Sequence, residues 1–439
     1  MPHALAAAAV ATLLAAPNAS APPAPSPALA PLSAIYPDLE ALYIDLHQNP
    51  ELSGHEEKTS AKLAARLRAL GYDVTERVGG YGVVAVMKNG KGPTVLVRAD
   101  MDALPVEEKT GLPYASKVRA KDDDGTVVPV MHACGHDVHM TSLIGAATLL
   151  ARAKSRWRGT LVLIAQPAEE LGGGARKMLD DGLLTRFPRP DFAVALHDNP
   201  HLPAGQVSVP VGYAFANVDS VDITIFGRGG HGSAPQNTVD PIVIAARTVL
   251  ALQTIVSREN DPRDPAVVTV GSIRGGTKHN IIPDEVKLQL TVRSYKEEVR
   301  NKLIAAIARI TKAEAAAAGA PKEPLVVVDP ARTYATYNDP ALSKRLAAAF
   351  AKTFGAGNVV DFAPVMGGED FGEIGMEAKI PSVILWVGAA DPQKIAAAGG
   401  DLTKLPWIHS SLWAPDREPT LKTGSAALTI AALELLGRP

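Results

Sequence analysis

Cysteine is nearly absent from this chain of 439 residues, because Cys134 is the only one. An intramolecular disulfide is therefore excluded, although secretion is compatible with a protein that lacks disulfides. An excess of charge is also missing: the formal net charge is -2, so we expect no nucleic acid or other polyanion as a partner. Hydrophobic residues make up 46% and charged residues 21%, a balance typical of a soluble globular enzyme. The length of the chain suggests two domains, possibly three.

Long hydrophobic runs are missing as well. No uninterrupted apolar stretch of about 20 residues occurs, so we expect no membrane span. The shorter run at residues 4–16, followed by small residues at 19–21, has the form of a signal peptide with its cleavage site. We predict a signal peptide over residues 1–21, a Pro/Ala-rich linker over residues 22–34 and a periplasmic or secreted protein. Because no Lys or Arg precedes the run, a cytoplasmic location is the alternative.

Hydrophobic periodicity predicts an α/β fold. Leucines at helical spacing indicate two helices, around residues 39–46 and 63–70. Apolar runs typical of buried parallel strands follow, with helical stretches between them, at residues 83–87, 94–97, 160–165, 192–196 and 383–387. This alternation predicts a mostly parallel sheet that is covered by helices on both faces.

Within residues 207–328 the pattern changes to β-α-β-β-α-β. This order is that of a ferredoxin-like α+β domain, which has a four-stranded antiparallel sheet with two helices on one face. Because the earlier pattern resumes afterwards, we predict that this domain is inserted into a catalytic domain formed by residues 35–206 and 329–439.

Metal-ligating residue types crowd the stretch around Cys134. Its neighbours include His132, His136, Asp137 and His139. A lone cysteine is usually a small buried hydrophobic residue, and a lone histidine is usually a hydrogen-bonded polar one. Their clustering favours a metal site instead, and thiolate and imidazole ligands suit zinc or manganese better than calcium or magnesium.

Carboxylates and histidines also follow three of the predicted strands. Ligands of α/β sheets bind beyond the carboxyl ends of the strands, so we expect these side chains to converge on one site. They are Asp100 and Asp102 after residues 94–97, Glu169 and Glu170 after residues 160–165, and His197 after residues 192–196. Adjacent carboxylates such as Glu169 and Glu170 can divide metal binding and proton transfer between them, which indicates hydrolase chemistry.

Six motifs occur together and in order. They are residues 98–105 (RADMDALP), 132–139 (HACGHDVH), 166–170 (QPAEE), 229–235 (GGHGSAP), 280–285 (NIIPDE) and 367–371 (GGEDF). Together they resemble the aminoacylase/carboxypeptidase family of two-metal hydrolases. The closest branch is that of indole-3-acetyl-amino-acid hydrolases, hippurate hydrolases and N-acyl-amino-acid amidohydrolases. The resemblance covers residues 35–436.

The resemblance implies metal-dependent hydrolysis of the amide bond of N-acyl amino acids, which releases a carboxylic acid and a free amino acid. The alternative within the family is a di- or tripeptide carboxypeptidase or aminopeptidase. A binding protein on the same fold would have lost the base or a metal ligand, and no such loss is visible.

The resemblance also implies a role for each site residue. Two divalent metal ions, manganese or zinc, would share one bridging ligand, Cys134. The implied ligands are Cys134, His136, Glu170, His197 and His409. Glu169 would be the general base, and Asp102 would orient a ligating histidine by accepting its second N–H.

The inserted domain is implied to be a lid and dimerisation domain of a homodimer or higher homo-oligomer. His231 resembles a residue that reaches across the dimer to stabilise the oxyanion, and Asn280 and Arg293 resemble residues that hold the substrate carboxylate. Simpler alternatives exist: the glycines beside His231 could serve backbone flexibility, and Arg293 could be an ordinary ion-pair partner. Glu369 and Asp370 could do no more than hydrogen-bond a loop.

The sequence departs from the family's pattern near two of the implied ligands. Asp198 stands beside His197 where an apolar residue is usual, which we expect to alter substrate fit rather than metal binding. His409 is assigned by its position, because residues 409–413 are less charged than the family's pattern. Three further residues are expected to support the ligands rather than to bind metal: His132, Asp137 and His139.

Overall fold

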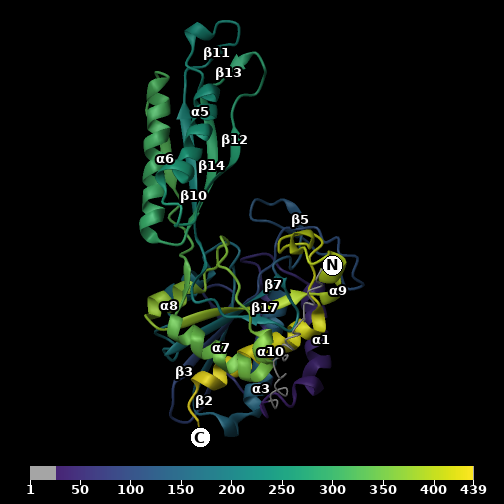
Figure 1. The fold of residues 1–439 in the computed structure, drawn as a ribbon. Coiled ribbons are helices and arrows are strands. Elements are labelled where there is room, and N and C mark those ends of the chain that lie inside the picture. Colours follow the sequence, from purple (N-terminus) through teal and green to yellow (C-terminus); the bar gives the residue numbers. More distant parts are fainter. Residues whose placement is uncertain (1–25, 439) are drawn as a thin grey trace, which may run out of the picture.

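The computed structural model describes residues 26–438 and has two parts (Figure 1). A broad α/β domain forms the base, and a narrow domain rises from it. The predicted signal peptide at residues 1–21 lies outside the described residues. Helix α1 (Leu32–Gln48) begins inside the predicted 22–34 linker, so the last residues of that segment are helical.

The base is built on a seven-stranded sheet with the order β1-β2-β6-β3-β7-β17-β8. Its four central neighbours run parallel: β6 (Gly159–Gln166), β3 (Thr94–Asp100), β7 (Phe192–Pro203) and β17 (Ser382–Ala390). Antiparallel strands complete both edges: β1 (Asp73–Val78), β2 (Gly82–Asn89) and β8 (Val207–Ser208). The predicted α/β class with a mostly parallel sheet is therefore confirmed.

The parallel assignment of residues 83–87 is wrong. These residues lie in β2, which runs antiparallel to both β1 and β6. A tight turn with positive φ at Gly79 and Gly80 returns the chain beside β1. Most of β2 is nevertheless buried, and burial on both faces gives the continuous apolar run that is typical of a parallel strand.

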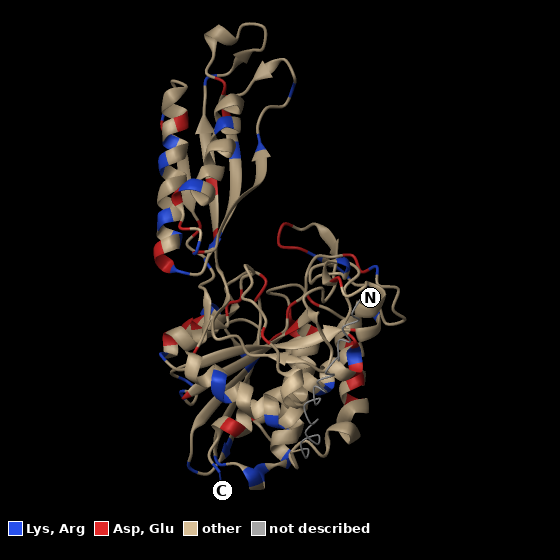
Figure 2. Cartoon of the chain, viewed as in Figure 1, with Lys and Arg blue, Asp and Glu red and all other residues tan. Residues whose placement is uncertain are grey.

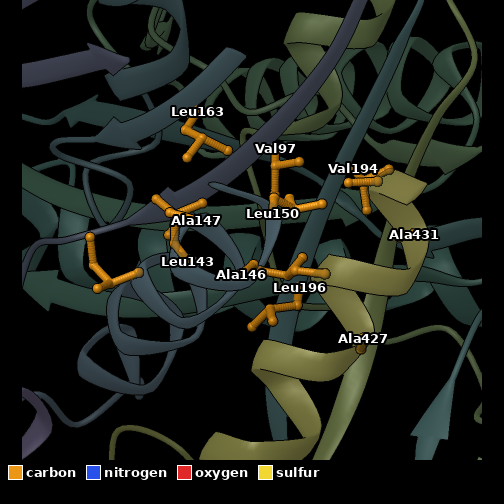
Figure 3. Packing of buried hydrophobic residues seen from close by; sticks show 14 of the residues in the cluster. Val97, Leu143, Ala146, Ala147, Leu150, Leu163, Val194, Leu196, Ala427 and Ala431 are labelled. Carbon is orange, nitrogen blue, oxygen red and sulfur yellow. The ribbon is translucent and has the colours of Figure 1, made fainter. Parts of the chain in front are cut away.

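Helices cover both faces of this sheet. One face carries α1, α2 (Glu57–Ala69), α3 (His136–Arg152), α7 (Pro340–Phe354) and α10 (Arg417–Leu435), while α4 (Gly174–Asp180) and α8 (Gly372–Ala378) cover the other. Leu143 and Leu150 of α3 pack on Val97 and Leu196 of the sheet (Figure 3). Burying each such leucine contributes about 1.5–3 kcal/mol, so this layer fixes α3, whose first turn enters the site.

The narrow domain has the predicted β-α-β-β-α-β order. Its elements are β10 (Asn217–Phe226), α5 (Pro241–Thr254), β12 (Ala266–Arg274), β14 (Glu285–Ser294), α6 (Glu297–Ala317) and β15 (Leu325–Val328). The sheet is antiparallel with the order β12-β14-β10-β15, and α5 and α6 share its apolar core. We call this domain the lid. The expected boundary at residue 207 precedes the first lid strand, because β8 belongs to the large sheet.

Helix α5 and the turn after it, Pro241–Glu259, form one helical segment that could cross a membrane by length and composition alone. Ile244 and Leu252 are buried in the lid core, which accounts for part of this apolar character. Val243 and Leu250 are exposed, with 55% and 73% of their surface accessible.

Short elements complete the fold. The small strands β11 (Gly230–His231) and β13 (Ile281–Ile282) pair at the far end of the lid (Figure 1). Two linker strands pair between the domains: β9 (Gly212–Phe215) and β16 (Thr336–Asn338). The base also carries β4 (Arg119–Lys121), β5 (Val127–Pro129) and α9 (Pro392–Ala397).

Candidate metal centre

Side chains from four separate segments meet at the carboxyl ends of the parallel strands. Cys134 precedes α3, and His136 is the first residue of that helix. Glu169 and Glu170 follow β6, and His197 lies within β7. His409 comes from the loop before α10. The convergence expected from the strand ends is present in the structure.

The sulfur of Cys134 is at the centre of this cluster. Its Sγ lies 3.6 Å from Nε2 of His197 and 3.3 Å from Nε2 of His409. Oε1 of Glu170 lies 3.5 Å from Nε2 of His409 and 3.9 Å from Nε2 of His136. These separations are those of atoms that could share a cation between them.

Several groups of donor atoms could hold a cation, and two of these sets have Cys134 in common. One set is Cys134, His136 and His197, and the other is Cys134, Glu170 and His409. Nε2 of His136 and Oε1 of Glu170 are buried without a hydrogen-bond partner among the described residues. Unpaired buried donors and acceptors are costly, and sulfur, nitrogen and oxygen ligands in this combination suit zinc or manganese. The residues therefore fit a pair of metal ions.

The protonation states of two ligands agree with metal binding. Nδ1 of His197 hydrogen-bonds the carbonyl of Asp198 at 2.8 Å, which leaves the lone pair of Nε2 facing Cys134. Burial, and then the charge of His139, holds the pKa of His197 well below its usual range, so the ring is neutral. Burial and Glu170 raise the pKa of the Cys134 thiol, so the thiolate forms only beside a cation.

The turn at Gly135 brings two ligands to the same side. Gly135 has a φ of +83°, and a Cβ atom there would lie 2.1 Å from Oδ1 of Asp198. Only glycine fits this close approach. As a result, Cys134 and His136 both face the cluster although one residue separates them.

Asp102 lies on the side of His136 opposite the cluster. Its Oδ1 is 3.3 Å from Nδ1 of His136, which directs Nε2 toward the other ligands. Burial opposes the charge on Asp102, but the ring of His136, the hydroxyl of Ser53 and the N–H of Glu170 together outweigh burial and lower the pKa of this carboxyl. The carboxylate is thus ionised where it would hold the ligating ring.

Glu169 approaches the same imidazole from the cleft. Its Oε2 lies 4.0 Å from Nε2 of His136. Burial, and then the neighbouring charges of Glu369 and Glu170, raises the pKa of Glu169 well above its usual range. A carboxylate with a raised pKa accepts a proton readily, as a general base requires.

Asp198 is not where substrate fit would place it. The side chain is fully buried, and its Oδ1 lies 2.8 Å from Nε2 of His139. The other nitrogen of His139, Nδ1, hydrogen-bonds Asp100 at 2.6 Å. Asp198 therefore pairs with His139 behind the ligands and does not line the cleft, and His139 has the supporting place expected of it.

A buried cationic group ties the site to the motif at residues 367–371. Arg98 has no exposed side-chain surface and pairs with Asp100 (2.6 Å), Glu369 (2.8 Å) and Asp370 (3.1 Å). Glu369 and Asp370 thus do more than hydrogen-bond a loop. Figure 2 shows the acidic residues gathered where the base faces the lid.

A cleft of about 880 Å³ opens over the cluster between the two domains. The lid contributes Arg293, and aromatic walls come from Phe215, Trp386 and Trp407. Arg293 donates from Nη1 to the carbonyl of Met366 at 2.8 Å, and it has no carboxylate partner among the described residues. The ion-pair alternative for Arg293 therefore finds no support.

Two other predicted residues lie outside this cleft. His231 is on β11 and Asn280 directly precedes β13, at the far end of the lid (Figure 1). They adjoin each other, because the N–H of Gly232 donates to the carbonyl of Asn280 at 2.9 Å. Both are exposed, and neither lines the cleft of its own chain.

Sequence reasoning missed Arg98 as the partner of Glu369 and Asp370, and it missed Ser53 and Glu56. Ser53 donates to Asp102 at 2.6 Å, and Glu56 accepts from the backbone beside Glu169. Of these three residues, only Arg98 lies in one of the six motifs, the one at residues 98–105, so only Arg98 could have been singled out from the sequence.

Comparison with known proteins finds a matching family, similar sequences and similar solved structures. The model of peptidase family M20/M25/M40 matches residues 96–399. An N-acetyl-L-cysteine deacetylase of Bacillus subtilis is 42% identical over 273 residues, which span 62% of this chain and 63% of that protein. Thermostable carboxypeptidase 1 of Saccharolobus solfataricus is 37% identical over 393 residues, or 89% and 93% of the two chains. A solved Bacillus subtilis structure, a dinuclear metal-binding peptidase, has a TM-score of 0.73 and 30% identity, covering 92% of this chain and 100% of that one.

Proposed function

Because this chain belongs to peptidase family M20/M25/M40, we propose that it hydrolyses the amide bond of N-acyl amino acids with two divalent metal ions. The predicted family resemblance is confirmed by the family match and by the deacetylase relative. Family membership makes the chain a hydrolase of amide bonds, and the substrate class and the choice of metal are the finer parts of the proposal.

The observation that carries the proposal is the pair of donor sets that share Cys134. The first set would be completed by His136 and His197, and the second by Glu170 and His409. Two ions held this way would polarise the amide carbonyl and make water a nucleophile at neutral pH. Manganese or zinc suits such a mixed thiolate, imidazole and carboxylate set.

The protein's own groups supply proton transfer and orientation. Glu169 would take a proton from the attacking water and return it to the leaving amine. Asp102 would hold the ring of His136 while this occurs. Among the described residues, Arg293 is the one Lys or Arg that lines the cleft. It would pair with the substrate carboxylate, while aromatic walls such as Trp386 would contact the acyl group.

Metal removal tests this function directly. Chelation should abolish hydrolysis of N-acyl amino acids, and manganese or zinc should restore it with two ions per chain by elemental analysis. Cys134→Ser should bind fewer ions, since a hydroxyl is a poor replacement for a shared thiolate. Full activity after complete metal removal would refute the proposal.

The carboxypeptidase relative supports a second candidate, a di- or tripeptide carboxypeptidase or aminopeptidase with the same site. An aminopeptidase would need a free carboxylate to hold the substrate amine. The acidic residues that line the cleft are Glu169 and Glu170, and both already have roles. A mass-spectrometric screen of N-acyl amino acids against dipeptides, at defined metal loading, separates the two: cleavage that is lost when the amine is acylated favours the peptidase.

We also propose that the active form is a homodimer in which the lid of each subunit serves the partner's site. The lid strand β12 has a neighbour on one side only among the described residues, and exposed apolar side chains adjoin it. These include Leu250 (73% exposed) and Ile273 (54%). An open edge beside an apolar face fits a second copy related by a twofold axis, which would carry His231 and Asn280 to another site.

Export remains a proposal supported by residues 4–21 alone. If they direct secretion, protein purified from the native host should begin near Pro22 and should be recovered outside the cytoplasm. Mature cytoplasmic protein that retains Met1 would contradict this.

A further inference from the structure

A connector without a predicted role lies behind the metal centre. It consists of residues 49–56 and joins α1 to α2. The carbonyl of Glu51 accepts from the N–H of Ala103 at 2.8 Å, and Leu52 forms a β-bridge with Ala103. The connector is therefore fixed beside the strand end from which Asp102 projects.

Two of its side chains reach groups that shape the site. Ser53 donates from Oγ to Oδ2 of Asp102 at 2.6 Å, and the same oxygen accepts from the N–H of Glu170 at 3.0 Å. Glu56 is fully buried, and its Oε1 accepts from the N–H of Ala168 at 2.8 Å. The connector thus contacts both the carboxylate behind His136 and the turn that carries the acidic pair.

The backbone of Ala168 adopts an unfavourable conformation. Its φ is +52°, in the left-handed region that a residue with a Cβ atom rarely occupies. Such a conformation costs about 1–2 kcal/mol and persists where the surroundings hold it. The buried carboxylate of Glu56 holds it here, because a hydrogen bond from a peptide N–H to a carboxylate is among the stronger ones.

This turn determines where the two acids point. In an extended strand, consecutive side chains point to opposite faces. After the turn at Ala168, the carboxylates of Glu169 and Glu170 instead both approach His136, with oxygens 4.0 Å and 3.9 Å from its Nε2. The two acids are adjacent in sequence, and both face His136 just after the turn at Ala168.

We propose that Glu56 is a positioning residue: by holding the left-handed turn at Ala168, it directs Glu169 and Glu170 toward the metal centre. This inference rests on the proposed hydrolase function and concerns how the base and the ligand are aimed. Glu56 itself does not line the cleft over the ligand cluster.

The first measurement compares Glu56→Ala with the native protein. We expect kcat to fall by about 10- to 100-fold, with a smaller change in KM, because supporting contacts of this kind typically affect activity and metal affinity to that extent. Competition with a chelator, followed by the absorption of bound cobalt, should show a lower affinity for the ion that Glu170 helps to bind. Oε1 of Glu56 also accepts from the N–H of Gly54 at 2.7 Å. Glu56→Gln keeps an oxygen that can accept from both Gly54 and Ala168, so it should retain most of the activity.

The second measurement asks whether the turn itself is the cause. Glycine adopts positive φ without steric cost, so adding Ala168→Gly to Glu56→Ala should restore part of kcat. Glu51→Ala is the matched control, because it removes a side chain that accepts from the N–H of Thr59 at 2.8 Å and caps α2. It should lower the melting temperature without changing kcat.

The outcomes separate the two claims. If the native protein does not hydrolyse N-acyl amino acids, the proposed function fails. If it does, and Glu56→Ala loses only stability or is not rescued by Ala168→Gly, the positioning role is refuted. If Glu56→Ala does not fold, Glu56→Asp is used instead, because its side chain is one methylene shorter and reaches the N–H of Ala168 less well. The kcat of Glu56→Asp must then fall, and it must recover when Ala168→Gly is added.

Discussion

The base and the lid differ in how completely each builds its share of the site. All five implied ligands, together with Glu169 and Asp102, lie on the base of one chain and within a few ångströms of each other. The lid places Arg293 in the cleft of its own chain but holds His231 and Asn280 at its far end. The implied metal ligands thus all come from one chain, whereas the proposed oxyanion donor, His231, lies far from the cleft of its own chain.

Burial follows the same division. The base surrounds its ligands with paired charges that have no exposed surface, such as Arg98 with Asp370 and His139 with Asp198. His231 is exposed, and its Nδ1 hydrogen-bonds the nearby Ser233 at 2.8 Å. Rigid support suits groups that hold a metal, whereas a group that serves another subunit must stay on the surface until that subunit binds.

The largest expected effect distinguishes the role of Glu169, the general base, from that of Glu170, a metal ligand. Glu169→Gln cannot accept a proton from water, so kcat should fall by about 10²–10⁴-fold while both ions stay bound. Glu170→Gln should lose metal instead. Kinetics combined with elemental analysis would check this, and two variants that behave alike would remove the division of labour.

The next largest effect is expected from His231 at the far end of the lid. His231→Ala should lower kcat by about 10²–10³-fold, the usual cost of losing one oxyanion donor. His279→Ala is the matched control, because it removes another exposed histidine, two residues before β13, which pairs with β11. Steady-state kinetics that show equal losses for both would indicate damage to the loop rather than loss of a donor.

A smaller effect should come from the part of the lid that already lines the cleft. Arg293→Met should raise KM for N-acyl amino acids by about 10- to 100-fold, because a charge-assisted hydrogen bond to the substrate carboxylate is lost. The corresponding N-acyl amino acid amides carry no carboxylate, so their KM should be unchanged. An equal rise in KM for acids and amides would contradict carboxylate recognition.

The smallest effect concerns the stability of the base and its pH dependence. Burial opposes a charge on His47, but hydrogen bonds to Asp137 (2.7 Å) and Glu108 (3.1 Å) outweigh it and raise the pKa of His47 to about 9. Because this pKa exceeds the unfolded value of about 6.5, the stabilisation is complete below about pH 6.5 and is lost as the pH rises toward 9.

Urea unfolding at several pH values measures this contribution. The free energy of unfolding should fall by about 1–3 kcal/mol between pH 6.5 and 9, and His47→Gln should flatten that slope. A slope identical in both proteins would show that His47 does not titrate in this range.

The sequence predicted what local patterns can encode. The lid order followed from the period of each element, and the site followed from polar residues such as Asp102 and Glu170 placed just after apolar strands. Contacts between distant residues carry no such pattern: Arg98 meets Asp370 and Glu56 meets Ala168 only because the fold brings them together. For the same reason, the antiparallel direction of β2 was beyond sequence reasoning.

The most direct test mixes two inactive variants, Glu169→Gln and His231→Ala, and lets their subunits exchange. If each lid serves the partner's site, one site in every heterodimer has its own Glu169 and receives an intact His231. Random pairing then predicts about a quarter of the native activity. Replacing Glu169→Gln by the double variant Glu169→Gln/His231→Ala should leave the mixture inactive. A mixture that demonstrably exchanges subunits yet stays inactive would contradict the account.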